Sequence, residues 1–206
     1  MSADIVGLVM FMKTRAFLIV LAASTGLVLA GSHSSGAQAA PLPSRAPDLD
    51  RAEGVYKLRF ANGDVSGDKF TSENVFELVK LTPKTAYFRI HAEFYNLHIC
   101  ALWGVADLER DALTYHGPAN FEGHPCVLKF TVNNDVIITN DVDGYCRSES
   151  CGARGGYGDG DRVDYPFKAR RRIRYMPVIL KSSEYASAVR ERDARRVGSP
   201  RPAAPK

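Results

Sequence analysis

The stretch Tyr87–Phe94, with the sequence YFRIHAEF, alternates apolar and polar side chains. Successive side chains of a β-strand point to opposite faces of its sheet. Phe88 and Ile90 therefore share one face, while Arg89 and His91 lie on the other. We expect a strand with one face in the core and one in water, as in an antiparallel sheet.

Six further stretches of similar character surround it, separated by pairs that contain Gly, Pro or Asn. They are Val55–Phe60, Val75–Leu81, Ile99–Glu109, Leu113–Tyr115, Cys126–Val132 and Val136–Asn140. Short strands punctuated by turns are typical of a β-meander, barrel or sandwich. We predict a mainly β fold, a small antiparallel β-barrel or meander of about seven strands over residues 54–181. On one strand Gly104 and Ala106 leave little side chain, which indicates a bend or close packing.

The chain after Asp141 is first rich in Gly and then basic. Ser182 is a good helix cap, and the apolar residues that follow it have helical spacing, which predicts a C-terminal helix over residues 182–197. Residues 198–206 are rich in Pro and Ala and are predicted to be a disordered tail. Residues 40–53 are predicted to be a flexible linker.

The N-terminal segment has the features of a secretory signal peptide over residues 1–39. Two basic residues precede the apolar run Ala16–Ala30, and Ala37–Ala39 has the small-x-small form of a cleavage site. Met12 is an alternative start, because an acidic residue and several apolar ones precede the basic pair. The apolar run is shorter than the roughly 20 residues that span a bilayer. We predict a periplasmic or secreted protein that is not transmembrane after cleavage.

All four cysteines, Cys100, Cys126, Cys146 and Cys151, follow the cleavage site. An even number of cysteines in an oxidising compartment predicts two disulfides. Three pairings are possible, and proximity in the sequence favours Cys100 with Cys126 and Cys146 with Cys151. The alternative is a thiolate metal site, but the spacing fits no common zinc pattern. We predict neither a metal nor a cofactor.

Charge is divided between an acidic body and a basic C-terminal arm. Residues 40–167 hold 13 basic and 19 acidic side chains, net −6, and residues 168–206 hold 12 and 3, net +9. An acidic body suits association with cationic envelope proteins such as lysozyme. A basic arm suits an anionic envelope polymer, and without interleaved aromatic residues it does not predict nucleic-acid binding. Alternatively, the arm is solvated and folds back on the body.

The sequence contains no nucleophile elbow, zinc-protease motif, P-loop or dinucleotide fingerprint. We therefore predict that the protein is not an enzyme and has no catalytic residues. The alternative is an envelope hydrolase that pairs His91 with Glu93 or Asp141 with Asp143. The two aspartates also resemble the start of a calcium loop, but the full spacing with a terminal Glu is missing.

Cysteine and glycine residues mark the second half of the predicted β domain. The marked stretches are Cys126–Phe130, Val136–Ile138, Asp143–Cys146 and Cys151–Tyr157, the last with the block Cys-Gly-Ala-Arg-Gly-Gly. This pattern resembles a β domain of uncharacterised exported bacterial proteins, which in some members follows an LprI-type lysozyme-inhibitor segment. The resemblance covers Val55–Tyr185 and implies an exported β domain of unassigned activity. The small helical segment typical of the LprI type is missing here.

Export, a pinned Gly-rich loop and the lack of catalytic motifs predict a non-catalytic binding or inhibitor module of the bacterial envelope, with lysozyme inhibition as one form. Arg154 and Tyr157 are the predicted contact residues, because Arg and Tyr are favoured anchors at interfaces. One alternative is that the loop only closes one end of the barrel. Another is a structural envelope protein tethered by its basic arm.

Overall fold

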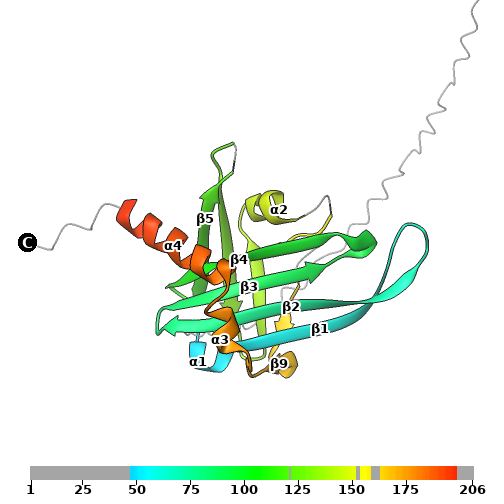
Figure 1. Cartoon of the computed structure of the whole chain (residues 1–206), viewed down its shortest axis with the longest axis horizontal. Coiled ribbons are helices and arrows are strands. Elements are labelled where there is room, and N and C mark those ends of the chain that lie inside the picture. The colour runs from blue at the N-terminus through cyan, green and yellow to red at the C-terminus, as the bar shows by residue number, and fades with distance from the viewer. Residues whose placement is uncertain (1–46, 121, 152–153, 159–162, 199–206) are drawn as a thin grey trace, which may run out of the picture. The chain divides into compact units, whose positions relative to one another are not determined.

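The structure, a computed structural model, describes residues 47–120, 122–151, 154–158 and 163–198 (Figure 1). The predicted signal peptide and the tail beyond Gly198 lie outside the described residues. The strands are β1 (Gly54–Gly63), β2 (Lys69–Thr82), β3 (Thr85–Glu93), β4 (Ile99–Glu109), β5 (Ala112–Ala119), β6 (Pro125–Val132), β7 (Val136–Asp141), β8 (Tyr165–Pro166) and β9 (Arg170–Arg171). The helices are α1 (Leu49–Ala52), α2 (Tyr145–Ser150), α3 (Met176–Ile179) and α4 (Ser183–Gly198), with 3-10 turns η1 (Tyr95–Leu97) and η2 (Phe167–Ala169).

The strands form one antiparallel sheet in the order β8-β7-β6-β5-β4-β3-β2-β1-β9. From β1 to β8 each strand pairs with its neighbour in the chain, so the sheet is a meander. The two edge strands, β8 and β9, have two residues each and are joined by η2. This short connection brings the edges of the sheet together and nearly closes a barrel. The predicted mainly β fold is therefore confirmed, and all seven predicted strands are present.

Aromatic side chains fill the inside of the barrel. Phe76 stacks between Phe130 and Tyr165, with ring centroids 5.4 and 4.8 Å away, and Phe88 packs on Phe130 at 4.7 Å. All four rings are buried. Burial of such large rings removes much apolar surface from water. The polar or charged residues next to them on each strand point to the outer face.

The barrel is split between β4 and β5. Only the hairpin ends of these strands pair, from Asp107 with Thr114 to Glu109 with Ala112. Tyr115 turns its ring into the split, against Gly104, where an added Cβ would lie 2.4 Å from the ring. The prediction of close packing at Gly104 is confirmed, and the partner is a single tyrosine ring.

The C-terminal helix packs on the outer face of the sheet and lies across β4 (Figure 1). Ser182 caps it, since its hydroxyl accepts a hydrogen bond from the Tyr185 N–H at 3.1 Å. A second apolar cluster lies between α3, α4 and the outer face, where Tyr87 meets Tyr185 edge to face at 5.3 Å. Its buried members are Val55, Val79, Tyr87, Val105, Ile173, Ile179 and Ala188. The predicted helix over residues 182–197 is thus present and docked.

The predicted flexible linker over residues 40–53 is wrong at its C-terminal end. Asp48 caps α1 by accepting a hydrogen bond from the Arg51 N–H, and Leu49 and Ala52 are buried. The Tyr56 hydroxyl donates to the Ala52 carbonyl at 2.7 Å. The segment is ordered because its two apolar side chains join the core.

In the part of the chain that the structure describes, no helix is long and apolar enough to cross a membrane.

Candidate functional site

The two disulfides join Cys100 to Cys151 and Cys126 to Cys146. The pairing favoured by proximity in the sequence is therefore wrong. Cys100 is on β4 and Cys126 is on β6, with β5 and the split between them, so at least about two strand spacings of 4.8 Å separate their strands. This separation exceeds the distance of roughly 5.5–6 Å that is usual between the Cα atoms of a disulfide.

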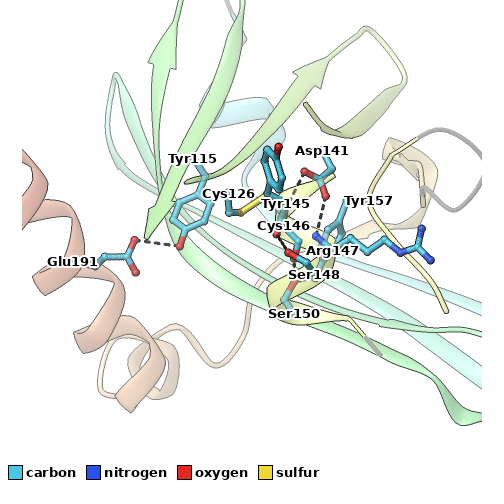
Figure 2. The surroundings of a disulfide bond; sticks show 10 residues. All are labelled: Tyr115, Cys126, Asp141, Tyr145, Cys146, Arg147, Ser148, Ser150, Tyr157 and Glu191. Atoms are coloured by element: carbon cyan, nitrogen blue, oxygen red, sulfur yellow. Dashed lines mark hydrogen bonds between the residues drawn. A yellow bond between two sulfur atoms is a disulfide. The ribbon is translucent and has the colours of Figure 1, made fainter. Parts of the chain in front are cut away.

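Helix α2 explains the observed pairing. Cys146 lies in the helix and Cys151 caps its end, and five residues of an α-helix correspond to a rotation of about 140° around its axis. The two cysteines therefore point in different directions, one to β6 and one to β4. Helix α2 is held at both ends across the split barrel, as Figure 2 shows at the Cys126 end.

Asp141 closes the N-terminus of α2. Its two carboxylate oxygens accept hydrogen bonds from the N–H groups of Cys146 at 3.2 Å and Arg147 at 2.9 Å (Figure 2). Burial raises the pKa of the Asp141 carboxyl, although these N–H groups, which favour the charged form, oppose the shift. The carboxylate is thus used to hold α2, whereas Asp143 is exposed. The negative charge of Asp143 also raises the pKa of Asp141, as the smallest of the causes.

The described part of the Gly-rich loop, residues 154–158, packs onto the barrel end. Tyr157 is only 2% exposed, and its hydroxyl lies 3.0 Å from the Ser150 hydroxyl. Gly155 has φ +98° and lies so close to Phe94 that an added Cβ would be 2.5 Å from the ring. The prediction that Tyr157 belongs to a contact surface is wrong, because its side chain is part of the core. Arg154 is exposed, and its role as a contact residue stays a prediction.

The outer face of β1–β4 is divided by α3 and α4. Near the helices its side chains belong to the second apolar cluster. The pairing register places Lys57, Val75, His91 and Ala101 in one cross-strand row on this face. Lys57 is exposed, and the other three residues are partly exposed. Trp103 lies on β4 beside this row and is 39% exposed.

Trp103 and the row residues Val75, His91 and Ala101 line a surface cleft of about 360 Å³, here called the Trp103 groove. Its lining consists of Val75, Arg89, Ile90, His91, Ala101, Trp103 and Glu184. Strands β2, β3 and β4 form its floor, and α4 contributes Glu184 at its border. An indole, small apolar side chains and a guanidinium thus lie together on a solvent-accessible surface, a combination typical of binding sites.

A buried network holds Arg89 at this groove. Glu77 is 1% exposed and receives hydrogen bonds from the Arg89 guanidinium at 2.6 and 3.1 Å. The Tyr175 hydroxyl donates to the same carboxylate. Burial, followed by this hydrogen bond, raises the pKa of the Tyr175 phenol. Glu77 therefore orients Arg89 and also attaches the segment before α3 to the sheet.

The hydrolase alternative named His91 with Glu93, and these side chains do lie together. His91 Nε2 is 3.4 Å from Glu93 Oε1. Both are on the open outer face, with side chains 44% and 31% exposed. Because they are successive outward residues of one strand, their proximity follows from strand geometry alone and does not itself indicate catalysis.

Comparison with protein families, with curated proteins and with solved structures finds no match to this chain. Among the described residues, no three His, Cys, Asp or Glu side chains are grouped to hold a metal ion. Trp103 was not singled out from the sequence, because Ile99, Ala101 and Val105 share its strand face and alternation therefore gives no sign that this face is exposed. The available signal was its type, since the chain has a single Trp and Trp is enriched at binding surfaces.

Proposed function

We propose that this protein is an exported, non-catalytic binding module that holds an extended ligand on the outer face of β1–β4. The observation that carries the proposal is the Trp103 groove. The only Trp of the chain lies there, partly exposed, with apolar side chains and an oriented arginine. A partly exposed indole can gain burial when a ligand covers it.

The rest of the molecule supports a binding role on this face. The aromatic cluster fills the barrel interior, so we place the ligand outside the barrel. Two disulfides fit an oxidising compartment, in agreement with the signal peptide expected from the sequence. A rigid sheet also has little conformational entropy to lose on binding.

The test uses the fluorescence of Trp103, which reports the groove without labelling because the chain has no other Trp. The oxidised protein, expressed from the full sequence, is titrated with peptidoglycan fragments, dextran and polygalacturonate. We expect a blue shift with at least one of them. Co-sedimentation with peptidoglycan sacculi gives a second measurement that does not depend on Trp.

The variant Trp103→Ala should weaken binding in the second assay by at least about tenfold, since partly buried aromatic anchors contribute roughly 2 kcal/mol or more. Val178→Ala is a matched control, because Val178 is an exposed apolar side chain on α3, outside the groove lining. Circular dichroism checks that both variants fold. Unchanged binding by Trp103→Ala, or no response to any polymer, would overturn the proposal.

Lysozyme inhibition is measured separately by muramidase activity with excess protein. We expect no loss, because the groove adjoins Lys57 and Arg171, and positive charge there disfavours a cationic enzyme. Stoichiometric inhibition that Trp103→Ala leaves unchanged would place the functional surface elsewhere. Release of reducing ends from the polymers would contradict the non-catalytic part of the proposal.

A further inference from the structure

Two adjoining clefts line β1 and β9 next to the Trp103 groove. The first, of about 500 Å³, is lined by Lys57, Arg59, Glu73 and Arg171. The second, of about 400 Å³, is lined by Val55, Lys57, Arg171, Arg172, Arg174 and Tyr175. Because both include Lys57 and Arg171, they form one continuous surface. We call its five cations, Lys57, Arg59, Arg171, Arg172 and Arg174, the basic edge.

The basic edge has far more positive than negative charge. Its clefts contain five cations and one carboxylate, Glu73, which leaves four positive charges in excess. Lys57 and Arg59 share Glu73, each at 2.8 Å. These two hydrogen bonds are the main cause that lowers the pKa of the Glu73 carboxyl, so Glu73 is ionised at neutral pH.

Three arginines of the basic edge have no counter-ion in the part of the chain that the structure describes. Within the described residues Arg171, Arg172 and Arg174 make no ion pair, and all three are exposed. Elsewhere in the basic arm, by contrast, Arg196 pairs with Asp107 and Arg195 with Glu191. Like charges held close together repel each other, and an anionic ligand removes that cost.

The basic edge and the Trp103 groove lie on the same face of the sheet. Lys57 is directly opposite Val75, which is opposite His91, and the last two line the groove. Trp103 on β4 and Lys57 on β1 are separated by three strand spacings, about 14 Å. A ligand that reaches both must be extended.

We propose that the ligand is an anionic polysaccharide, with a sugar ring stacked on Trp103 and its acidic groups on the basic edge. This inference rests on the proposed function and names its ligand class. The C–H-lined face of a sugar ring matches the flat indole, and carboxylate, sulfate or phosphate oxygens match the guanidinium donors. A polymer provides both at repeated intervals along an extended chain.

The experiment compares four probes by Trp103 fluorescence and by equilibrium dialysis. Polygalacturonate carries carboxylates, dextran sulfate carries sulfates, dextran is neutral, and polyglutamate is an acidic chain without sugar rings. We expect one or both acidic polysaccharides to bind at least about tenfold more tightly than dextran at 50 mM salt, and to lose affinity by about tenfold at 200 mM. Polyglutamate should bind more weakly and leave the fluorescence almost unchanged.

Two variants change the charge in opposite directions. The double variant Arg171→Gln and Arg172→Gln should weaken the binding of the acidic polysaccharide by at least about tenfold and reduce its salt dependence. Glu73→Gln should strengthen binding by about twofold to fivefold, because Glu73 is the one carboxylate among the described residues that line the two clefts. Arg110→Gln, at an exposed arginine in the turn between β4 and β5 that lines neither cleft, is the matched control and should change nothing.

The outcomes separate this inference from the proposed function. Equal binding of dextran and the acidic polysaccharides, with loss in Trp103→Ala, would keep the groove and overturn the anionic ligand. Equal binding of polyglutamate would indicate an acidic protein partner and would also overturn it. Weaker binding by Glu73→Gln, or unchanged binding by the double arginine variant in a folded protein, would contradict the role of the basic edge.

Discussion

The barrel end closed by α2 and the open outer face of β1–β4 both carry aromatic and charged side chains, but they use them differently. At the barrel end Tyr157 is buried beside Ser150, and Asp141 is occupied by two N–H groups. On the outer face Trp103 is exposed, and Arg171 has no counter-ion among the described residues. Groups that satisfy one another stabilise the fold, whereas groups left unsatisfied are available to a ligand.

A pinned, Gly-rich loop is weak support for a contact surface. Gly155 is needed because the backbone has a positive φ and passes close to the Phe94 ring. The loop composition thus reflects packing at the barrel end. The outer face has no unusual composition, and its character comes from the alignment of ordinary strand residues.

The largest expected effect is at the barrel end, on removal of a disulfide. The double variant Cys100→Ala and Cys151→Ala opens a loop whose ends are 51 positions apart in the sequence. The double variant Cys126→Ala and Cys146→Ala opens a loop whose ends are 20 positions apart. The chain-entropy relation gives losses of about 4 and about 3 kcal/mol in the free energy of unfolding. Urea denaturation measures both.

If the barrel end is structural and the outer face functional, each disulfide variant should still bind the acidic polysaccharide under conditions where it is folded. Wild-type stability in both variants would show that packing alone holds α2. Loss of binding in a folded Cys126→Ala and Cys146→Ala variant would show that the two regions are coupled.

The second effect distinguishes a buried from an exposed aromatic residue. Tyr157→Phe removes the hydroxyl that meets Ser150 and should cost about 1 kcal/mol of stability without changing ligand binding. Trp103→Phe should cost less than about 0.5 kcal/mol, as is usual for exposed positions, while weakening binding. Thermal unfolding and equilibrium dialysis measure the two effects, and the reverse pattern would invalidate the division between the regions.

The third effect is the pH dependence of Asp141. Its pKa is raised in the folded protein, so the folded state holds this proton more tightly than the unfolded state. The contribution of Asp141 to stability therefore falls as the pH rises from the ordinary Asp value, about 3.9, through the raised folded value. Denaturation of wild-type protein and Asp141→Asn across pH 3 to 7 should show a difference that changes only in this window. A difference independent of pH would contradict the raised pKa.

The smallest expected effect is that of Arg154→Ala. Arg154 is exposed, and its loss should change stability by less than about 0.5 kcal/mol and leave polysaccharide binding unchanged. Co-sedimentation with sacculi and urea denaturation test this. A clear loss of binding would support Arg154 as a contact residue, as predicted from the sequence. It would contradict the assignment of a purely structural role to the barrel end.

Much of the fold was predictable because the relevant signals are local. Alternation in Tyr87–Phe94 identifies a strand and assigns its faces, and the cap at Ser182 identifies the start of α4 to within one residue. The short edge strands β8 and β9 were missed because two residues carry no periodicity. Helix α1 was missed because its order depends on contacts with the core.

The candidate site was less predictable than the fold. Alternation in Tyr87–Phe94 places His91 on a polar face, so its exposure was predictable, whereas Trp103 shares its strand face with Ile99, Ala101 and Val105 and its exposure was not. The disulfide partners were not accessible, because they depend on β5 lying between β4 and β6 and on the rotation between the two cysteines of α2.

By itself, the sequence determined that this protein is an antiparallel β domain with a capped C-terminal helix and a basic arm. Only the tertiary structure decided which aromatic residue is buried, which cysteines pair and where the arm places its charge. Residues Arg171–Arg174 join Lys57, more than 100 positions earlier in the sequence, because η2 brings the two edges of the sheet together. Strand periodicity acts over two residues, whereas closure of a barrel joins segments from opposite ends of the chain.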